Sequence, residues 1–330
     1  MQLDLRLRED DGIEGFTLNK NMNIIYCNQS SNPEVPLRAF QNALPHAKIR
    51  QWQAGDNAPA DYALVWKPPV EMLAGRDDLK AIFNLGAGVD AIIKMVDQLP
   101  KQVPIIRLED AGMGEQMADY VCHAVLHYFR RFDLFARQAQ HAHWQSIAPL
   151  SKKEFTVGVL GMGTLGQSIA ASLLQLKFPV IGWSNSAKQI DEIQCYSGAD
   201  ELPKFLAESK VIVCILPLTE QTSGILNRHT LAQLPRGAYV INVARGAHIV
   251  EQDLLELVRN GHIAGATLDV VQTEPLPGNH PFWQEPKITI TPHVAALTLW
   301  DESAVQIAEK IALLEQGLPV TGVIDCVKGY

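Results

Sequence analysis

The chain has 330 residues, of which 47% are hydrophobic and 19% charged, a balance typical of a globular protein with room for about two domains. Its formal net charge of −8, without any lysine/arginine run, argues against binding to nucleic acid or to an anionic membrane surface. Five scattered cysteines without a CxxC pair, no apolar stretch of membrane-spanning length and a charged N-terminus predict a cytoplasmic protein with no disulfides and no metal.

Residues 1–21 are polar and acidic, so we expect a disordered extension, with Met22 as the structural beginning. Beyond Met22, short apolar runs alternate with helical segments, which predicts a small, open, parallel sheet of the flavodoxin-like kind. The expected strands are 23–26, 47–52, 61–66, 81–85 and 105–108, and the expected helices are 33–44 and 70–73. A glycine-rich turn, residues 86–90, leaves the fourth strand.

A long helix is predicted over residues 115–138, after the break at Gly112-Met113-Gly114. We interpret this helix as the crossing between two domains. Its aromatic tail is larger than one face of a surface helix needs: Tyr128, Phe129, Phe132 and Phe135. Packing in the core and contact with a second subunit are both open explanations.

The run 155–183 reads as a strand, a glycine turn, a helix and a second strand. Its turn is Gly161-Met162-Gly163-Thr164-Leu165-Gly166, whose glycines allow a tight turn, close approach to a pyrophosphate, and close packing of helix on strand. The helix N-terminus offers N–H groups and a partial positive charge to the phosphates. The run is therefore predicted to bind a dinucleotide.

The same alternation continues to residue 291 and predicts a second, larger sheet, a Rossmann domain. Its further strands are expected at 210–216, 239–243, 263–269 and 288–291, and its helices at 202–208, 228–234 and 251–260. A last helix, 301–315, is long enough to return to the first domain. We therefore predict an α/β protein of two doubly wound parallel-sheet domains. The substrate domain takes residues 22–114 and 300–330, and the NAD(P)-binding domain takes 115–299.

The end of the second strand of the larger domain, after Trp183, indicates which dinucleotide binds. An NAD site usually carries Asp or Glu there to bond the ribose 2′-hydroxyl. This chain has Ser184-Asn185-Ser186 instead, with Lys188 two residues on. Hydroxyls, an amide and an ammonium accept a 2′-phosphate that a carboxylate would repel, so we expect NADPH, with NADH weaker.

Three ionisable residues follow predicted strands, namely Arg245, Glu274 and His293. The carboxyl ends of parallel strands line the ligand crevice, which would put all three beside the nicotinamide. Hydride transfer to a carbonyl leaves an oxyanion that needs a proton, and His293 suits that role near neutral pH. Glu274 would fix the imidazole tautomer, and Arg245 would grip a carboxylate or keto oxygen. Each side chain also has a structural explanation, as a strand cap, a turn residue or a buried histidine.

Together these motifs resemble the D-isomer-specific 2-hydroxyacid dehydrogenase family. The resemblance covers nearly all of the chain from Met22 onwards, and its motifs are residues 161–166, 216–222, 242–246, 268–275 and His293. Three more stretches, 64–73, 107–117 and 328–330, are similar to family members that reduce glyoxylate and hydroxypyruvate. Many members have two glycines after the catalytic histidine, where this chain has Val294-Ala295-Ala296. We expect that departure to affect cofactor fit or substrate size.

The resemblance implies an enzyme that reduces small 2-keto acids, glyoxylate to glycolate and hydroxypyruvate to D-glycerate, with Arg245, Glu274 and His293 as catalytic residues. It implies that substrate-binding groups are Trp66, the backbone N–H groups of Ala87 and Gly88, Met113, and Arg245. It adds cofactor contacts at Leu216, Pro217, Thr222, Val243, Ala244 and Asp269. It also implies a homodimer that forms through the helix at 115–138.

Two other functions remain open at this point. One is an NAD-linked dehydrogenase of the same family, of the D-lactate or phosphoglycerate type, against which the missing acid after Trp183 argues. The other is a dinucleotide-sensing binding protein without catalysis, which would not need Arg245, Glu274 and His293. His123 and His127 stand one helical turn apart, as a metal pair would, but no acidic third ligand follows at a recognisable spacing.

Overall fold

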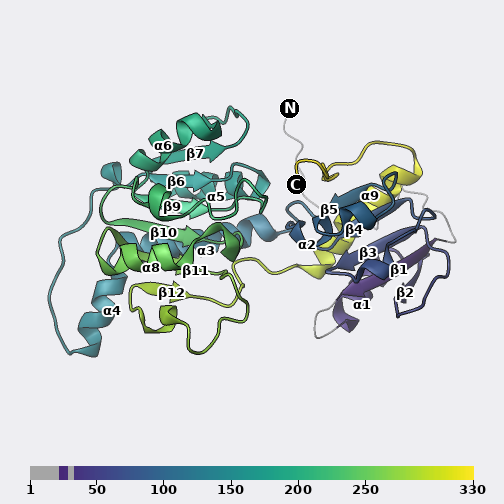
Figure 1. Cartoon of the computed structure of the whole chain (residues 1–330), viewed down its shortest axis with the longest axis horizontal. Coiled ribbons are helices and arrows are strands. Elements are labelled where there is room, and N and C mark those ends of the chain that lie inside the picture. The colour runs from purple at the N-terminus through teal and green to yellow at the C-terminus, as the bar shows by residue number, and fades with distance from the viewer. Residues whose placement is uncertain (1–21, 29–32) are drawn as a thin grey trace, which may run out of the picture. The chain divides into compact units, whose positions relative to one another are not determined.

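The computed structural model describes residues 22–28 and 33–330, which form two compact units (Figure 1). One unit contains the described residues up to Gly86, then Met95–Leu108 and Trp300–Ile324. The other contains Ala87–Lys94, Glu109–Leu299 and Asp325–Tyr330. The sequence-based division had put the first crossing after residue 114 and had assigned residues 87–94 and 325–330 to the smaller unit. The extension predicted for residues 1–21 lies outside the described residues.

The smaller unit is built on a five-stranded parallel sheet with the order β2-β1-β3-β4-β5. Its strands are β1 (Asn23–Asn28), β2 (Lys48–Gln51), β3 (Tyr62–Trp66), β4 (Ala81–Asn84) and β5 (Ile105–Arg107). The central strands are buried along most of their length, as apolar runs covered on both faces should be. This is the flavodoxin-like order of a doubly wound sheet, so the predicted fold class is confirmed for this unit.

The helices of the smaller unit join distant parts of the chain. Helix α1 (Glu34–Ala43) packs beside α9 (Trp300–Glu315), and two 3-10 turns complete the unit, η1 (Val70–Met72) and η2 (Val96–Gln98). The carboxylate of Glu315, at the end of α9, accepts hydrogen bonds from Tyr62 Oη and Lys80 Nζ, both at 2.7 Å. The buried Lys310 donates from Nζ to the carbonyl of Arg107. The last helix therefore returns to the first unit, as predicted.

The larger unit holds a seven-stranded parallel sheet with the order β12-β11-β10-β9-β6-β7-β8. Its strands are β6 (Val157–Leu160), β7 (Val180–Ser184), β8 (Gln194–Ser197), β9 (Val211–Cys214), β10 (Ala238–Asn242), β11 (Ile263–Leu268) and β12 (Ile288–Ile290). The order reverses between β6 and β9, where the chain crosses from one half of the sheet to the other. A doubly wound sheet binds its ligand at the carboxyl ends of the strands beside such a reversal, so the Rossmann prediction is confirmed.

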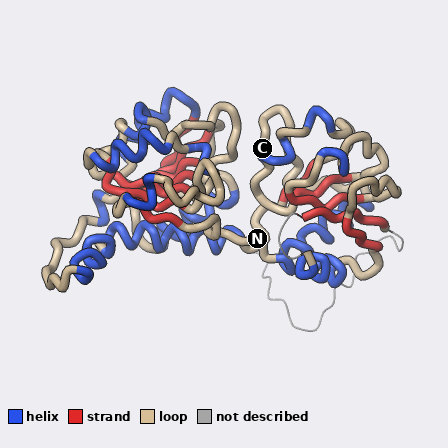
Figure 2. The backbone as a smooth tube through the Cα atoms, turned by 60° about the horizontal axis from the view of Figure 1, so that its bottom comes forward, coloured by secondary structure: helices blue, strands red, loops and turns tan. Residues whose placement is uncertain are grey.

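Helices cover both faces of this sheet (Figure 2). The helices of the larger unit are α2 (Asp90–Ile93), α3 (Met113–Phe129), α4 (Phe132–Gln140), α5 (Thr164–Gln175), α6 (Gly198–Glu208), α7 (Arg228–Leu231) and α8 (Glu251–Arg259), with 3-10 turns η3 (Lys152–Glu154), η4 (Gly246–His248) and η5 (Pro281–Gln284). Helix α3 packs along α5. Two clusters of buried residues, one on each face, form the core; Phe205 and Leu254 belong to one cluster, and Val125 and Ile169 to the other.

Two sequence-based assignments were wrong in the larger unit. The helix predicted over 115–138 is two helices, because Arg131 adopts a left-handed conformation (φ +58°) between α3 and α4. The edge strand β8 was missed, since its four residues, QCYS, have little apolar character. Tyr128, from the aromatic tail, is buried and stacks on Tyr239 at 4.5 Å, whereas Phe132 is 49% exposed. Packing in the core therefore explains Tyr128, and contact with a second subunit stays a prediction for Phe132.

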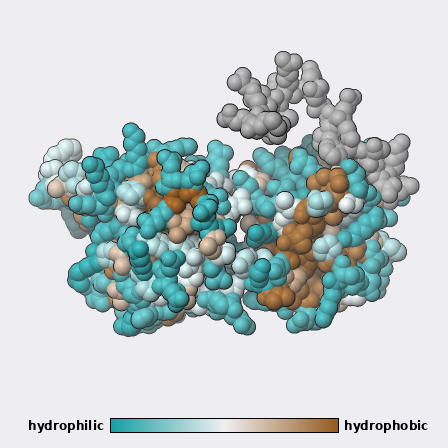
Figure 3. Space-filling view, turned by 90° about the horizontal axis from the view of Figure 1, so that it is seen from above, coloured by the Kyte–Doolittle hydropathy of each residue, from teal (hydrophilic) through white to brown (hydrophobic). Residues whose placement is uncertain are grey.

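The surface agrees with the composition. On the face drawn in Figure 3, hydrophilic side chains cover most of the larger unit, and an apolar band crosses the smaller one. Among the described residues, no helix combines the length and the apolar character that a membrane crossing needs.

Candidate active site

The glycine turn between β6 and α5 is required by its own packing. Gly161 has φ +118°, and a Cβ there would lie 2.8 Å from the carbonyl oxygen of Ile215. A Cβ on Gly166 would lie 1.9 Å from the carbonyl oxygen of Gly161. Gly163, by contrast, has open space around its Cα and caps α5. The turn is therefore closed on the protein side and open where a pyrophosphate would approach the helix N-terminus.

The end of β7 carries the side chains that were predicted to bind a 2′-phosphate. Ser184 is buried and donates from Oγ to the carbonyl of Ser186 at 2.8 Å. That bond tightens the turn, and Asn185, Ser186 and Lys188 are exposed beyond it. Three polar side chains, one of them an ammonium, are thus accessible at the position where an NAD site carries an acid.

The loop after β9 is closed by a threonine. Thr222 donates from Oγ1 to the carbonyl of Pro217 at 2.7 Å and accepts from the N–H of Thr219 at 2.8 Å. Leu216, at the start of this loop, is buried under it. Three predicted cofactor contacts, Leu216, Pro217 and Thr222, therefore belong to one ordered loop next to the glycine turn, since β9 pairs with β6.

Arg245 follows β10, and its neighbours shape the turn that presents it. Asn242 donates from Nδ2 to the carbonyl of Arg245 at 3.0 Å and accepts from the N–H of Ala244 at 3.1 Å. Val243 and Ala244 are buried, so the backbone is held from below while the arginine side chain stays half-exposed. The guanidinium donates from Nη1 to the carbonyl of Ala244 at 2.7 Å.

A carboxylate that sequence reasoning missed holds the other side of the guanidinium. Asp90, the first residue of α2, accepts from Nε of Arg245 at 2.9 Å. Gly88 lies against the same group, since a Cβ there would fall 1.6 Å from Nη2. The structure thus brings together Arg245 and Gly88, both predicted to bind substrate. The available signal for Asp90 was its position as the first acid after the glycine-rich turn.

The three other predicted substrate residues have different surroundings. Trp66, at the end of β3, is half-buried in the smaller unit, and its ring lies so close to Gly86 that a Cβ there would be 2.5 Å away. Met113, the first residue of α3, is 6% exposed in the larger unit. Ala87 is half-exposed beside Gly88.

His293 and Glu274 form a hydrogen-bonded pair. Nδ1 of His293 lies 2.9 Å from Oε2 of Glu274, and both side chains are exposed, at 44% and 39%. His293 has φ +57°, and its N–H donates to the carbonyl of Asp269 at 2.8 Å. The contact with Glu274 uses Nδ1, so it directs the other ring nitrogen, Nε2, to an approaching ligand. Since the carboxylate can only accept, Nδ1 carries a proton, and Nε2 is left to hold the second proton of the imidazolium, the form that can donate from Nε2.

Asp269 supports the loop that carries His293. Its buried carboxylate accepts from Thr291 Oγ1 at 2.6 Å, from the N–H of Val294 at 2.8 Å and from the N–H of Ala295 at 2.8 Å. Tyr120, on α3, bonds the same threonine hydroxyl at 2.5 Å. The residues that replace the usual glycines are therefore fixed by Asp269, for which the resemblance had implied a cofactor contact.

The geometry matches one family in particular. A family model described as D-isomer specific 2-hydroxyacid dehydrogenase, NAD binding domain, matches residues 122–295, which include the glycine turn, Arg245, Glu274 and His293. The chain belongs to this family.

Other members of the D-isomer-specific 2-hydroxyacid dehydrogenase family match almost the whole chain. A protein named glyoxylate/hydroxypyruvate reductase A, from Serratia proteamaculans (strain 568), is 49% identical over 313 residues, which are 94% of this chain and 100% of that protein. A family structure from Xanthobacter autotrophicus Py2, in complex with NADPH and MES, is 40% identical with a TM-score of 0.89, covering 94% of this chain and 99% of that one. A third match is the NADPH-dependent glyoxylate/hydroxypyruvate reductase of Sinorhizobium meliloti, in complex with NADP and sulfate. It is 34% identical with a TM-score of 0.87 and covers 94% of this chain and 100% of that one.

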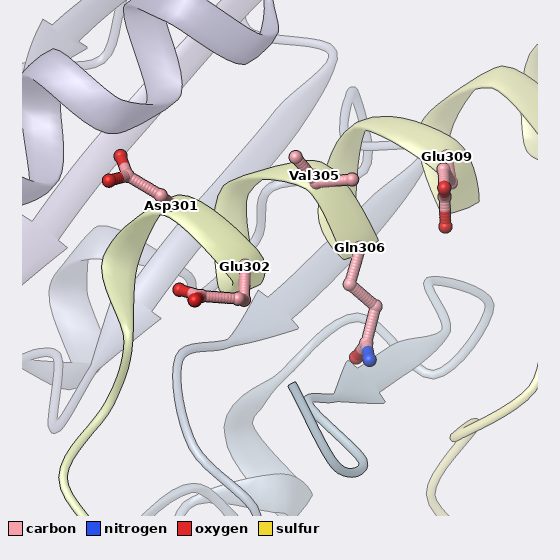
Figure 4. A pocket seen from close by; sticks show the side chains of 5 residues that line it. All are labelled: Asp301, Glu302, Val305, Gln306 and Glu309. Atoms are coloured by element: carbon pink, nitrogen blue, oxygen red, sulfur yellow. The ribbon is translucent and has the colours of Figure 1, made fainter. Parts of the chain in front are cut away.

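Two other features of the chain do not have the chemistry of a keto-acid or metal site. A surface pocket of about 390 Å³ lies on one face of α9 (Figure 4), lined by Asp301, Glu302, Val305, Gln306 and Glu309. Its three carboxylates would repel an anionic keto acid, and it contains no predicted site residue. The rings of His123 and His127 are 5.8 Å apart, but within residues 22–28 and 33–330 no group of three or more His, Cys, Asp or Glu side chains could hold a metal.

Proposed function

We propose that this chain is an NADPH-dependent 2-keto-acid reductase that converts glyoxylate to glycolate and hydroxypyruvate to D-glycerate. The observation that carries the reaction type is the 2.9 Å contact between His293 Nδ1 and Glu274 Oε2 at the carboxyl end of the sheet. The substrate class follows the relatives, since two of them are named for glyoxylate and hydroxypyruvate and match 94% of this chain.

The cofactor is NADPH, because the residues present fit it. Gly163 leaves the N-terminus of α5 open to a pyrophosphate, and Asn185, Ser186 and Lys188 offer donors to a 2′-phosphate. Two solved relatives are complexes with NADPH or NADP. When bound, NADPH supplies the hydride. We assign Leu216, Pro217, Thr222, Val243, Ala244 and Asp269 to the surroundings of the same ligand, as the family resemblance implies.

The residues of the chain then bind the substrate and supply a proton. Arg245 binds the carboxylate or the keto oxygen of the 2-keto acid, and the N–H groups of Ala87 and Gly88 bind the carboxylate. His293, protonated on Nε2, donates that proton to the carbonyl oxygen as the carbon is reduced, and Glu274 stabilises the imidazolium beforehand. The products are the 2-hydroxy acid and a neutral histidine, which takes a proton from solvent for the next turnover.

We further infer that the protein acts as a homodimer in the cytoplasm, with α3, α4 and the loop after α4 at the interface. Phe132, on α4, is 49% exposed and Trp144, in the loop after α4, is 101% exposed, and both lie in or next to the stretch through which the family resemblance implies a dimer. Replacing both, Phe132→Ser and Trp144→Ser, should lower the mass measured by light scattering to that of one chain. Trp283→Ser, at a 55% exposed tryptophan on η5, is the matched control that should remain dimeric.

Steady-state rates test the activity directly. NADPH and NADH are each paired with glyoxylate, hydroxypyruvate and pyruvate. We expect the highest kcat/KM with NADPH and the first two acids. Preference for NADH with pyruvate would indicate a D-lactate enzyme instead, and binding of NADPH without turnover of any acid would indicate a sensor.

A further inference from the structure

A buried histidine, His248, lies directly behind the arginine of the candidate site. It is 0% exposed and ends the 3-10 turn η4 that follows Arg245. The N–H of Arg245 donates to its Nδ1 at 3.2 Å, and its Nε2 lies 3.3 Å from the carbonyl oxygen of Pro217. Its imidazole therefore joins the loop after β9 to the loop after β10.

These contacts fix the form of the ring. Nε2 faces only the carbonyl of Pro217, so it carries the proton of the neutral ring and donates it there, and Nδ1 of that ring accepts from the N–H of Arg245. The carbonyl of Arg245 lies 3.0 Å from the same Nδ1 and closes the turn. Burial lowers the pKa of His248, as does the charge of Arg245, while the two carbonyls and the carboxylate of Asp90 oppose that shift. The ring is neutral near pH 7.

The two loops that the ring joins are both held on their far sides. The carbonyl of Pro217 also accepts from Thr222, so the ring bonds a point that is already ordered. On the other side, a Cβ on Gly246 would lie 2.0 Å from the carbonyl oxygen of Val271, which leaves the backbone after Arg245 no room to shift towards β11. The imidazole therefore sets the separation between the loop after β9 and the backbone of Arg245.

We propose that neutral His248 is a positioning residue of the reductase. It holds Arg245, and so the bound keto acid, in register with the loop expected to carry the cofactor. This inference rests on the function proposed above. It gives a reason for an imidazole at this place, because an apolar side chain of similar size would fill the space and leave the N–H of Arg245 without an acceptor.

Three substitutions separate the two hydrogen bonds. His248→Asn keeps an acceptor near the position of Nδ1, His248→Gln keeps a donor near the position of Nε2, and His248→Leu removes both. We expect His248→Leu to lower kcat/KM for the keto acid by roughly tenfold to a hundredfold, mostly through kcat, because a small misplacement of a substrate-binding group is costly. The dissociation constant of NADPH should change less. The amide variants should each recover part of the loss.

The pH profile distinguishes positioning from simple packing. Reduction of the keto acid takes up one proton, so the rate falls as pH rises. It also needs neutral His248, so the wild-type rate falls again at acid pH, below the ordinary histidine pKa of about 6.5. The charged groups that face the ring are Arg245 and Asp90. His248→Leu should lose the acid-side fall caused by the ring and keep the alkaline one.

Ile249→Val is the control, since it trims the buried residue that follows His248 in the sequence and leaves the hydrogen bonds of the ring intact. It should keep wild-type kinetics at a slightly lower melting temperature. The inference is wrong if the wild type turns over the keto acids and His248→Leu has a kcat/KM within twofold of the wild-type value. It is also wrong if the rate of His248→Leu still falls at acid pH as the wild-type rate does. If His248→Leu does not fold, equal kinetics of wild type and both amide variants overturn it. A wild-type protein that binds NADPH but turns over none of the acids overturns the proposed function instead.

Discussion

Two glycine turns leave the carboxyl ends of parallel strands in this chain, and their glycines serve different purposes. In the turn after β6, Gly161 and Gly166 are each required by backbone atoms, because a Cβ would meet the carbonyl of Ile215 or of Gly161. In the turn after β4, Gly86 and Gly88 are required by side chains, because a Cβ would meet a tryptophan ring or an arginine guanidinium.

The difference separates glycines that the fold requires from glycines that make room for a side chain of the candidate site. A glycine that meets backbone builds the turn itself, so its loss should disturb folding and cofactor binding together. A glycine that meets Arg245 makes room for a substrate-binding group, so its loss should disturb catalysis and leave the fold intact. The first turn therefore belongs to the proposed cofactor end of the site, and the second to its proposed substrate end.

The largest effect is expected at the substrate end, from His293→Ala. This change removes the proposed proton donor and should lower kcat by about 10²–10⁴, the usual contribution of a general acid. The dissociation constant of NADPH, measured by fluorescence titration, should stay near the wild-type value, because the cofactor end is untouched. His229→Ala, at an exposed histidine on α7, is the control. Unchanged turnover in His293→Ala would remove His293 from the mechanism.

Gly166→Ala tests the cofactor end. The added methyl would lie 1.9 Å from the carbonyl oxygen of Gly161, so backbone must shift, at a cost of roughly 1–3 kcal/mol. We expect a melting temperature several degrees lower and weaker NADPH binding in the same variant. Gly278→Ala, at a glycine with nothing within 4 Å of the added atom, should change neither quantity. If Gly166→Ala has the wild-type melting temperature and the wild-type affinity for NADPH, the proposed difference between the two turns is wrong.

Gly88→Ala is the counterpart at the substrate end. Its methyl would lie 1.6 Å from Nη2 of Arg245, a side chain that can move aside where backbone cannot. The guanidinium would then leave its place between Asp90 and the glycine turn. We expect kcat/KM for glyoxylate to fall roughly tenfold to a hundredfold, with melting temperature and NADPH affinity close to wild type. A loss of stability equal to that of Gly166→Ala would show that both turns are structural.

Much of this architecture could be predicted from the sequence, because its signals are local. The turn at 161–166 and the alternation of apolar runs with helices suffice to predict two parallel sheets. Local signals failed where polarity or backbone conformation overrode the pattern. The polar edge strand β8 has no apolar run that would predict a strand. The break between α3 and α4 occurs at Arg131, and no glycine or proline there predicts it.

Some residues of the candidate site could likewise be proposed from local sequence signals, and others could not. Arg245, Glu274 and His293 could be found from their places after strands, but their roles could be assigned only by assuming that those strands end at one edge. Asp90 and His248 were missed for a physical reason, since each acts through a contact that only the fold creates. Asp90 is 155 residues from Arg245, and His248 contacts Pro217 across 31 residues. A buried histidine in a sequence has the same appearance as an exposed one.

The smallest expected effect sharpens the description of the cofactor end. Asn185→Asp puts a carboxylate on an exposed residue after β7, where a 2′-phosphate would lie. Repulsion should raise the KM for NADPH, and a bond to the 2′-hydroxyl should favour NADH, so the ratio of kcat/KM values shifts towards NADH by about tenfold, or ~1.4 kcal/mol. Because the position is exposed, high salt should reduce the shift by screening. Gln252→Glu, which adds the same charge on the exposed face of α8, should leave the ratio unchanged. Equal or better use of NADPH by Asn185→Asp would place the 2′-phosphate elsewhere and leave Lys188 without its proposed ligand.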